Sequence, residues 1–217
     1  MYEATVIVPT RNEEEVIGKV LRKLKKLGRN YEIIVVDKSE DSTPEICKRF
    51  GVRVIRQRSS GKGNAMKLGA KLARSNFLVF IDGDDTYPVK VIPKMLKILK
   101  RERRAMVCGS RLLGKWESNF SHKIVNKILS SFFSVLYSKT TDLLTGLRAI
   151  RKEDFFSLRL ESKGFEIETE MHIKASKRGI KIIEIPITYK KRAGKKKYSV
   201  IRDTIKILKL LFLSVFR

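Results

Sequence analysis

The chain of 217 residues is 42% hydrophobic and 33% charged, which suits one globular domain and excludes an intrinsically disordered chain. Its formal net charge of +25 favours an anionic partner: nucleic acid, an anionic lipid surface or a phosphorylated small molecule. Adaptation to high temperature is an alternative cause of the Lys-rich composition, although it usually brings matching Glu. Cys47 and Cys108 are too far apart in the sequence to suggest a metal site, and we expect a reducing compartment.

The first half of the chain alternates apolar segments with amphipathic ones. Strands are expected at residues 4–8, 31–36, 52–55 and 77–81, and helices at about 12–27, from 42 onward, and at 63–73. Three acidic residues, Glu13 to Glu15, are placed in the first turn of the first helix, where the helix dipole favours them. Apolar strands joined by helices predict an α/β fold with a mostly parallel sheet flanked by helices.

The second half contains two amphipathic segments, at residues 120–137 and 200–217, and a strand at 180–187 interrupted by Pro186. In the first segment, apolar residues such as Ile128 and Phe132 alternate at helical spacing with polar residues such as Asn126 and Ser130. We expect a catalytic domain over residues 1–199, which includes the helix at 120–137, followed by an amphipathic helix at 200–217.

Neither amphipathic segment reaches the roughly 18–20 apolar residues of a membrane span, and no signal-peptide pattern opens the chain. We therefore expect the protein to lie on a membrane surface without crossing it. The alternative is that the two helices pack on the domain or pair between protomers.

The segment Ile81-Asp82-Gly83-Asp84-Asp85 directly follows an apolar strand. Ligands of open α/β folds bind at the carboxyl ends of parallel strands. Residues two apart in an extended chain point the same way, so Asp82 and Asp84 can converge on one ligand. Two carboxylates suit a hard divalent cation that takes its other ligands from phosphate oxygens. A plain turn is the alternative, since Asp and Gly also favour turns.

Two other predicted strands end in polar residues. Asp37 ends the second strand, and Pro9-Thr10-Arg11-Asn12-Glu13 follows the first. Each could be a simple cap or turn, but their coincidence favours a shared site. The Ser60–Ala65 segment, with Lys62, precedes a helix whose free N–H groups suit an anion, although it lacks the spacing of a kinase P-loop. The basic run at 190–197 is either a phosphate-binding loop or a solvated charge cluster.

In order along the chain, these motifs resemble the family 2 glycosyltransferases, particularly the polyprenyl-phosphate branch that includes dolichyl-phosphate mannose synthases. The matching segments are VIVPTRNEEE, VVDKSEDST, GKGNAMKLGA, FIDGDD, VCGSR, DLLTGLRAIRKE, GFEIETEM and RAGKKK, which span residues 6–197. The resemblance implies a GT-A (Rossmann-like) fold, a requirement for Mg²⁺ or Mn²⁺, a nucleotide-sugar donor, a polyprenyl or dolichyl phosphate acceptor, and inversion at the anomeric carbon. It also implies peripheral attachment at the cytoplasmic face of the cell membrane.

The resemblance also assigns roles to individual residues. Asp82 and Asp84 are the expected metal ligands and catalytic residues, and Gly83 completes their motif. Glu170 matches a family acid without a role that the sequence defines, and His122 and His172 are expected to be structural. The remaining donor-site or phosphate-site candidates are Pro9, Arg11, Glu13, Val36, Asp37, Lys38, Lys62, Arg111, Arg192 and Lys197.

Several residues depart from the family pattern. Lys38 stands where the family commonly has an Asp that contacts the nucleobase, and a cation cannot accept a hydrogen bond from guanine N1–H. Arg11 replaces a frequent Tyr, Thr86 a metal-binding Gln, and Lys196 the usual Ser of the closing loop. The base therefore stays open between GDP-mannose and UDP-sugar donors.

Two other functions remain as alternatives. The first is a basic nucleic-acid-binding protein, which the net charge suggests but no recognised binding motif supports. We therefore expect no nucleic-acid partner. The second is a catalytically inactive membrane-associated relative, which the departure at Lys38 leaves open.

Overall fold

The computed structural model describes residues 2–117, 120–192 and 200–216. Within them, seven strands form one sheet in the order β3-β2-β1-β4-β6-β5-β7. The strands are β1 Ala4–Thr10, β2 Tyr31–Asp37, β3 Arg53–Arg56, β4 Phe77–Phe80, β5 Ala105–Trp116, β6 Arg148–Arg151 and β7 Lys181–Tyr189. All neighbours are parallel except β6, which is antiparallel to both β4 and β5. The predicted mostly parallel α/β sheet is confirmed.

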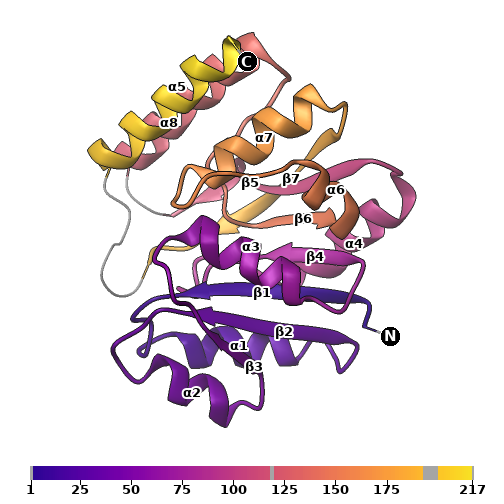
Figure 1. Ribbon diagram of the computed structural model, residues 1–217, viewed down its shortest axis with the longest axis vertical. Helices are drawn as coiled ribbons and strands as arrows, with labels where there is room; N and C mark the ends of the chain where they lie inside the picture. Colours follow the sequence, from indigo (N-terminus) through magenta and orange to yellow (C-terminus); the bar gives the residue numbers. More distant parts are fainter. Residues whose placement is uncertain (1, 118–119, 193–199, 217) are drawn as a thin grey trace.

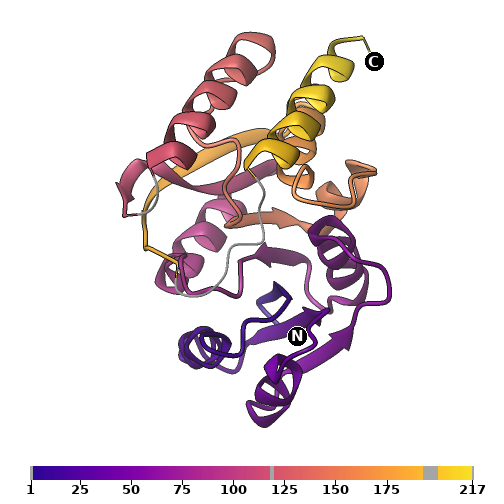
Figure 2. The same ribbon diagram turned by 90° about the vertical axis from the view of Figure 1, so that its left-hand side faces the viewer.

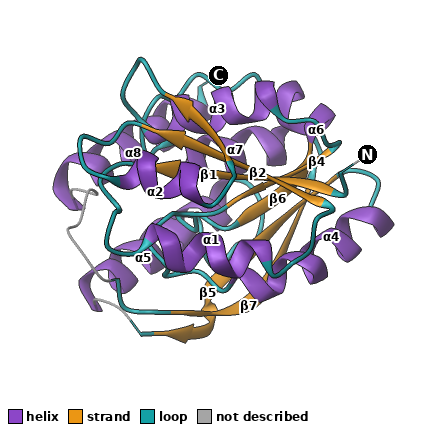
Figure 3. Cartoon of the chain, turned by 90° about the horizontal axis from the view of Figure 1, so that it is seen from below, coloured by secondary structure: helices purple, strands orange, loops and turns teal. Residues whose placement is uncertain are grey.

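Helices cover both faces of this sheet, as Figure 3 shows. The helices are α1 Ile17–Lys25, α2 Thr43–Arg49, α3 Lys62–Leu72, α4 Ile92–Arg101, α5 Phe120–Leu136, α6 Lys152–Ser157, α7 Ile167–Lys177 and α8 Val200–Val215, with a 3₁₀ turn at Val89–Val91. One core packs α1, α2 and α4 against the sheet, and a second packs α3, α6 and α7 against the opposite face. Strand residues alternate between these cores, as the period of two requires: Val6 and Val8 face one, and Ile7 faces the other.

The helices α5 and α8 lie side by side at one end of the molecule (Figures 1 and 2). A third core holds them to the domain through Leu129 and Phe133 of α5, Ile207 and Leu211 of α8, and Ile173 of α7. Within the described residues, no helix is long and apolar enough to cross a bilayer.

Three features differ from the sequence-based expectations. The first helix begins at Ile17 and not near Asn12, because the intervening residues form a turn in which the Glu13 carbonyl accepts the backbone N–H groups of Val16 and Ile17. β7 continues through Pro186 to Tyr189. It can do so because it is an edge strand that pairs only with β5, and an edge strand tolerates Pro.

The third difference is the orientation of α5. Asn126 and Ser130, expected on the outer polar face, are 1% and 2% exposed and face the domain. Ile128 and Val135 are 62% and 85% exposed. The helix is therefore held by a mixed polar and apolar inner face, and it presents apolar side chains outward.

Candidate active site

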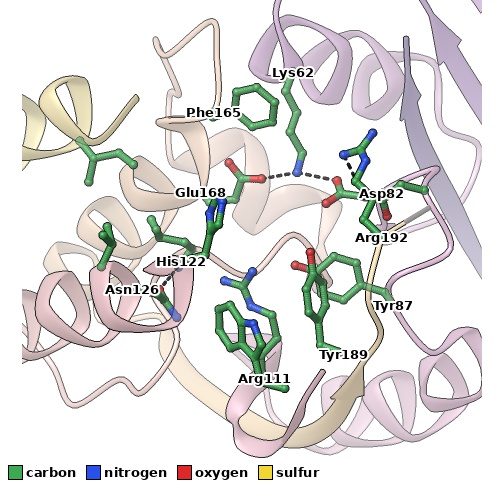
Figure 4. Close-up of a pocket in the computed structure, with 15 residues that line it drawn as sticks. Lys62, Asp82, Tyr87, Arg111, His122, Asn126, Phe165, Glu168, Tyr189 and Arg192 are labelled. Carbon is green, nitrogen blue, oxygen red and sulfur yellow. Dashed lines mark hydrogen bonds and ion pairs between the residues drawn. The ribbon is translucent and has the colours of Figure 1, made fainter. Parts of the chain in front are cut away.

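Two adjoining pockets lie beside the carboxyl end of β4 and share five lining residues: Lys62, Asp82, Asp84, Phe165 and Arg192. The first pocket, drawn in Figure 4, extends toward α5 and α8 and is lined by Tyr87, Arg111, Trp116, Asn126, Glu168 and Tyr189, among others. The second extends across the ends of β1 and β2. The Asp82–Asp84 motif thus stands where the two pockets meet.

Asp84 is held tightly at this junction. Thr86 donates its backbone N–H and its hydroxyl to Asp84 Oδ1 at 3.2 and 2.6 Å, and Arg192 Nη1 lies 3.0 Å from Asp84 Oδ2. Burial, together with the neighbouring charge of Asp82, raises the pKa of Asp84 above its usual value. A cation bound here would relieve both effects, because it would stabilise the ionised carboxylate.

Asp82 is paired with the buried ammonium of Lys62, at the start of α3. Lys62 Nζ lies 2.5 Å from Asp82 Oδ1 and 2.6 Å from Glu168 Oε1, at the start of α7 (Figure 4). Burial opposes the charge of Lys62, but Asp82 and Glu168 outweigh it and raise the pKa of Lys62. The chain must also approach closely here, since a Cβ at Gly146 would lie 2.6 Å from Asp82 Oδ2.

One buried oxygen of Glu168, Oε2, has no hydrogen-bond partner among the residues that the structure describes. Its side chain is almost fully buried, and burial raises the pKa of Glu168 although the charge of Lys62 opposes the shift. A buried acceptor without a partner is costly unless a ligand satisfies it. Because Glu168 lines the first pocket, a ligand hydroxyl or N–H there can supply the missing hydrogen bond.

Arg192, three residues after the end of β7, forms ion pairs with two loops of the sheet edge. Besides Asp84, its guanidinium contacts Glu13, with Arg192 Nη2 2.6 Å from Glu13 Oε1. In this structure the two motif carboxylates are therefore each paired with a cation of the chain, Asp82 with Lys62 and Asp84 with Arg192. Both cations line both pockets, so each can face an anionic ligand bound at the motif.

Arg111 provides another positive charge to the first pocket. Its guanidinium makes a bidentate contact with Asp142, Nε to Oδ2 at 2.8 Å and Nη2 to Oδ1 at 2.7 Å. It also stacks near Trp116 and Tyr189, 4.3 and 5.1 Å from their ring centroids. Asp142 is the main cause that raises the pKa of Arg111 against the opposing effect of burial. The side chain is thus a fixed cation with restricted orientation, suited to phosphate.

The second pocket follows the order of the strands. From Asp82 and Asp84 after β4, its lining passes Pro9 and Arg11 at the end of β1 and reaches Lys38 after β2. Gln57, after β3, and the Ser60–Gly61 loop complete this far end. Lys38 Nζ donates to the Arg58 carbonyl at 3.1 Å, which holds the ammonium beside the pocket.

Two other predicted donor-site residues lie beneath this pocket and do not line it. Val36 is fully buried and belongs to the core around α3. Asp37 is fully buried and accepts hydrogen bonds from Thr10, Ser39 and Arg56. Both side chains support the strand ends beside the pocket.

The remaining predicted residues are a glycine of the motif, the basic run and the two histidines. Gly83 packs so closely on Thr10 that an added Cβ would lie 2.8 Å from Thr10 Cγ2. Lys197 and most of the basic run at 190–197 lie outside the described residues. His172 is structural as expected: Arg148 Nη1 lies 2.7 Å from its Nδ1, and burial lowers its pKa well below the usual value. His122, also expected to be structural, lines the first pocket.

In the GFEIETEM segment, Glu170, for which the sequence defined no role, has a structural one, and Glu168, which was not singled out, lines the first pocket. Glu170 points away from the pockets and accepts backbone N–H groups of Glu161 and Ser162 at 2.8–3.1 Å, beside Lys174 at 2.7 Å. Glu168, two residues before Glu170, forms an ion pair with Lys62. Tyr87, Trp116, Asp142 and Tyr189 also line or support the first pocket and were missed. No strand end was predicted near Trp116 or Asp142, and Tyr87 and Tyr189 follow the predicted strands 77–81 and 180–187 but belong to no motif that was singled out.

Comparison with known proteins shows the family of the chain. Residues 5–159 match the model of Glycosyl transferase family 2. A dolichyl-phosphate hexose transferase of Haloferax volcanii is 34% identical over 202 residues, covering 90% of this chain and 86% of that protein. A dolichol-phosphate mannosyltransferase of Pyrococcus furiosus is 29% identical and covers 95% of this chain and 64% of that protein.

Solved structures show the same fold. Glucosyl-3-phosphoglycerate synthase of Mycobacterium tuberculosis, in complex with Mn²⁺, UDP-glucose and phosphoglyceric acid, superposes with a TM-score of 0.80 at 20% identity, covering 98% of this chain and 79% of that one. The expected GT-A fold is confirmed. The chain belongs to glycosyltransferase family 2.

Proposed function

We propose that the chain transfers a hexose from a nucleoside-diphosphate sugar to a polyprenyl phosphate, such as a dolichyl phosphate, at a membrane surface. The observation that carries this proposal is the meeting of two pockets at one carboxylate pair. One pocket runs over the strand ends, and the other lies beneath two helices whose outer side chains are apolar. The dolichyl-phosphate hexose transferase that resembles the chain supports the same reaction class.

The second pocket suits the donor. With the diphosphate beside Asp82 and Asp84, the nucleoside extends along the ends of β1 and β2, so that the base reaches Lys38 and Gln57. This placement follows the rule that ligands of open α/β sheets bind at the carboxyl ends of the strands. The sugar then lies toward Lys62 and Glu168, where the unpartnered Glu168 Oε2 can accept a hydroxyl hydrogen bond.

The motif residues fit a divalent metal. Among the described residues, no cluster of three or more His, Cys, Asp or Glu could hold a metal ion. Mg²⁺ or Mn²⁺ would instead be held by Asp82 and Asp84 and by the diphosphate, as Mg²⁺ commonly is. The Mn²⁺ in the mycobacterial glucosyl-3-phosphoglycerate synthase supports this assignment. Such a metal would neutralise the negative charge of the departing nucleoside diphosphate.

The first pocket suits a lipid phosphate. Arg111 and Arg192 supply cations, and Val125, Leu144 and Ile207 add an apolar side toward α5 and α8. A phosphate oxygen attacks the anomeric carbon, the bond from this carbon to the nucleoside diphosphate breaks, and the diphosphate leaves with the electron pair. Since the attacking phosphate is already an anion, a general base is not needed. Rate enhancement comes from orientation and charge stabilisation.

The outer faces of α5 and α8 suit the interfacial region of a bilayer. Their exposed apolar side chains are Phe120, Ile124, Ile128, Phe132, Val135 and Leu136 of α5, and Ile205, Leu208, Phe212, Leu213 and Val215 of α8, with Phe216 directly after it. Exposed lysines flank them at Lys127 and Lys209. Amphipathic helices with this composition lie in the membrane plane, and nearby basic residues add about 1 kcal/mol each on anionic lipids. We propose that the protein is peripheral and lies at the cytoplasmic face of the membrane.

The proposal is tested by incubating the protein with a panel of UDP- and GDP-hexoses, Mn²⁺ and vesicles that contain either polyprenyl phosphate or polyprenol. We expect labelled hexose in the lipid fraction only with the phosphate. Equal labelling of polyprenol, or no labelled lipid with any donor, would show that the acceptor assignment is wrong.

A further inference from the structure

The inner face of α5 carries a polar side chain that reaches the pocket cation indirectly. Asn126 is 1% exposed, and its Nδ2 donates to Asp142 Oδ1 at 2.8 Å. The same carboxylate receives the side chain of Arg111 and, at 2.8 Å, the backbone N–H of Arg111. One buried carboxylate, that of Asp142, therefore joins an α5 side chain to the guanidinium that lines the first pocket. Figure 4 shows Asn126 and Arg111 in the lining of this pocket.

Other hydrogen bonds hold the loop that carries Asp142 in place. Asp142 is fully buried, and its backbone N–H donates to Glu184 of β7 at 2.9 Å. Asn126 Oδ1 accepts the backbone N–H of Leu144 at 3.2 Å. Asp142 is thus held by β7 through its backbone N–H and by α5 through its carboxylate, so that a shift of α5 would act on the carboxylate and not on the backbone anchor.

The position of Arg111 depends on the same carboxylate. Two of its guanidinium nitrogens are used by Asp142, and its plane is stacked near Trp116 and Tyr189. Bidentate pairing fixes the orientation of the plane as well as its distance. A rotation of Asp142 therefore redirects the edge of the guanidinium that faces the pocket.

We propose that Asn126 is a positioning residue which, through Asp142, sets the Arg111 guanidinium for the acceptor phosphate. The seating of α5 on the bilayer is thereby coupled to the site. This inference rests on the proposed function, since it takes the first pocket as the site of the lipid phosphate. It predicts that loss of the Asn126 contact weakens use of the acceptor and leaves use of the donor unchanged.

Ser130 offers a matched control on the same helix face. It lies one turn after Asn126, is 2% exposed, and its hydroxyl accepts the backbone N–H of Leu143 at 2.9 Å, in the same loop. Ser130→Ala therefore removes an equivalent anchor between α5 and the loop without touching Asp142. Alanine is a favourable helix residue, so both Asn126→Ala and Ser130→Ala retain the helix.

The experiment measures KM for polyprenyl phosphate in vesicles and KM for the nucleotide sugar, in both variants. We expect Asn126→Ala to raise the acceptor KM by about fivefold or more, in keeping with a lost hydrogen bond to a charged group, and Ser130→Ala to change it by less than about twofold. Neither variant should change the donor KM. In an Arg111→Ala background, Asn126→Ala should have no further effect on the acceptor KM.

The outcomes separate this inference from the proposed function. Equal effects of Asn126→Ala and Ser130→Ala, or an Asn126→Ala effect that persists without the Arg111 side chain, would show that Asn126 only anchors the loop. A wild-type protein that transfers no hexose to polyprenyl phosphate would overturn the proposed function and this coupling together.

Discussion

Substitution of Asp84 by Asn separates the chemistry of the motif from the stability of the fold. Asparagine has nearly the same shape, and its Oδ1 can still accept both hydrogen bonds that Thr86 donates. The substitution removes the negative charge beside Arg192, while Arg192 keeps its contact with Glu13. The fold should therefore persist, and the motif should lose one of its two charged ligands.

The two expected effects have opposite signs. Loss of a metal ligand should lower kcat by about a hundredfold or more, equivalent to about 2.7 kcal/mol of transition-state stabilisation. Stability should be unchanged or higher at neutral pH. The pKa of Asp84 is raised in the folded protein, so the folded state binds this proton more tightly than the unfolded state does, and ionisation of Asp84 costs stability as the pH rises. Asparagine removes that cost, and its advantage should shrink as the pH is lowered.

The assay compares hexose transfer and thermal unfolding of both proteins, the latter over a series of pH values. Asp85→Asn is the control, since Asp85 pairs with Lys23 outside the pocket lining and should leave kcat within about twofold. Full activity of Asp84→Asn, or wild-type activity in excess EDTA, would refute the metal-dependent mechanism. A large loss of unfolding temperature at neutral pH would refute the argument from the raised pKa.

Three further predictions concern the base, the glutamates of α7 and the C-terminal helix. Lys38→Asp should change the relative inhibition by UDP and GDP with little change in kcat, because an unpaired polar group at the base edge costs about 1–3 kcal/mol. An unchanged ranking of the two nucleotides would mean that Lys38 does not face the base. Glu168→Gln should lower kcat at constant unfolding temperature, whereas Glu170→Gln should keep kcat and lower the unfolding temperature by the equivalent of about 1–2 kcal/mol. Because the pKa of Glu170 is lowered in the folded state, its contribution to stability is present at neutral pH and is lost on acidification. A pH series of unfolding temperatures would detect this loss. A chain that ends at Ser199 should keep its sheet, unfold at a lower temperature because the third core loses Ile207 and Leu211, and lose flotation with anionic liposomes. Equal flotation of both chains would exclude α8 as an anchor.

The N-terminal half of the fold could be predicted because its signals are local. Apolar runs such as 4–8 and 77–81 are buried on both faces, and strands of this kind differ clearly from the amphipathic helices between them. The Asp82–Asp84 motif followed from the same logic, since it comes directly after such a strand. The start of α1 was misplaced because Glu13 is used by tertiary contacts with Thr43 and Arg192, which no local pattern indicates.

The second half of the site depends on long-range contacts. Arg111, Asp142 and Tyr189 come from three separate segments. Arg111 and Tyr189 meet because β5 pairs with β7, and Asp142 reaches them from the segment before β6, which also pairs with β5. The antiparallel strand β6 has only four residues, too few for a clear alternating pattern. Periodicity also assigned the inner face of α5 wrongly, because Asn126 is buried by a hydrogen bond to Asp142, and hydrophobicity alone cannot show such a contact.

The central claim is that donor and acceptor meet at the Asp82–Asp84 motif, with the nucleoside over the ends of β1 and β2. The most direct measurement is a crystal structure of the protein grown with Mn²⁺ and a nucleoside diphosphate that raises its unfolding temperature. We predict an anomalous Mn²⁺ peak in contact with the Asp82 and Asp84 carboxylates, Arg192 turned from Asp84 toward phosphate, and the base beside Lys38 and Gln57. A nucleotide bound elsewhere, or bound in this pocket with Arg192 still paired to Asp84 and no metal peak, would contradict the account.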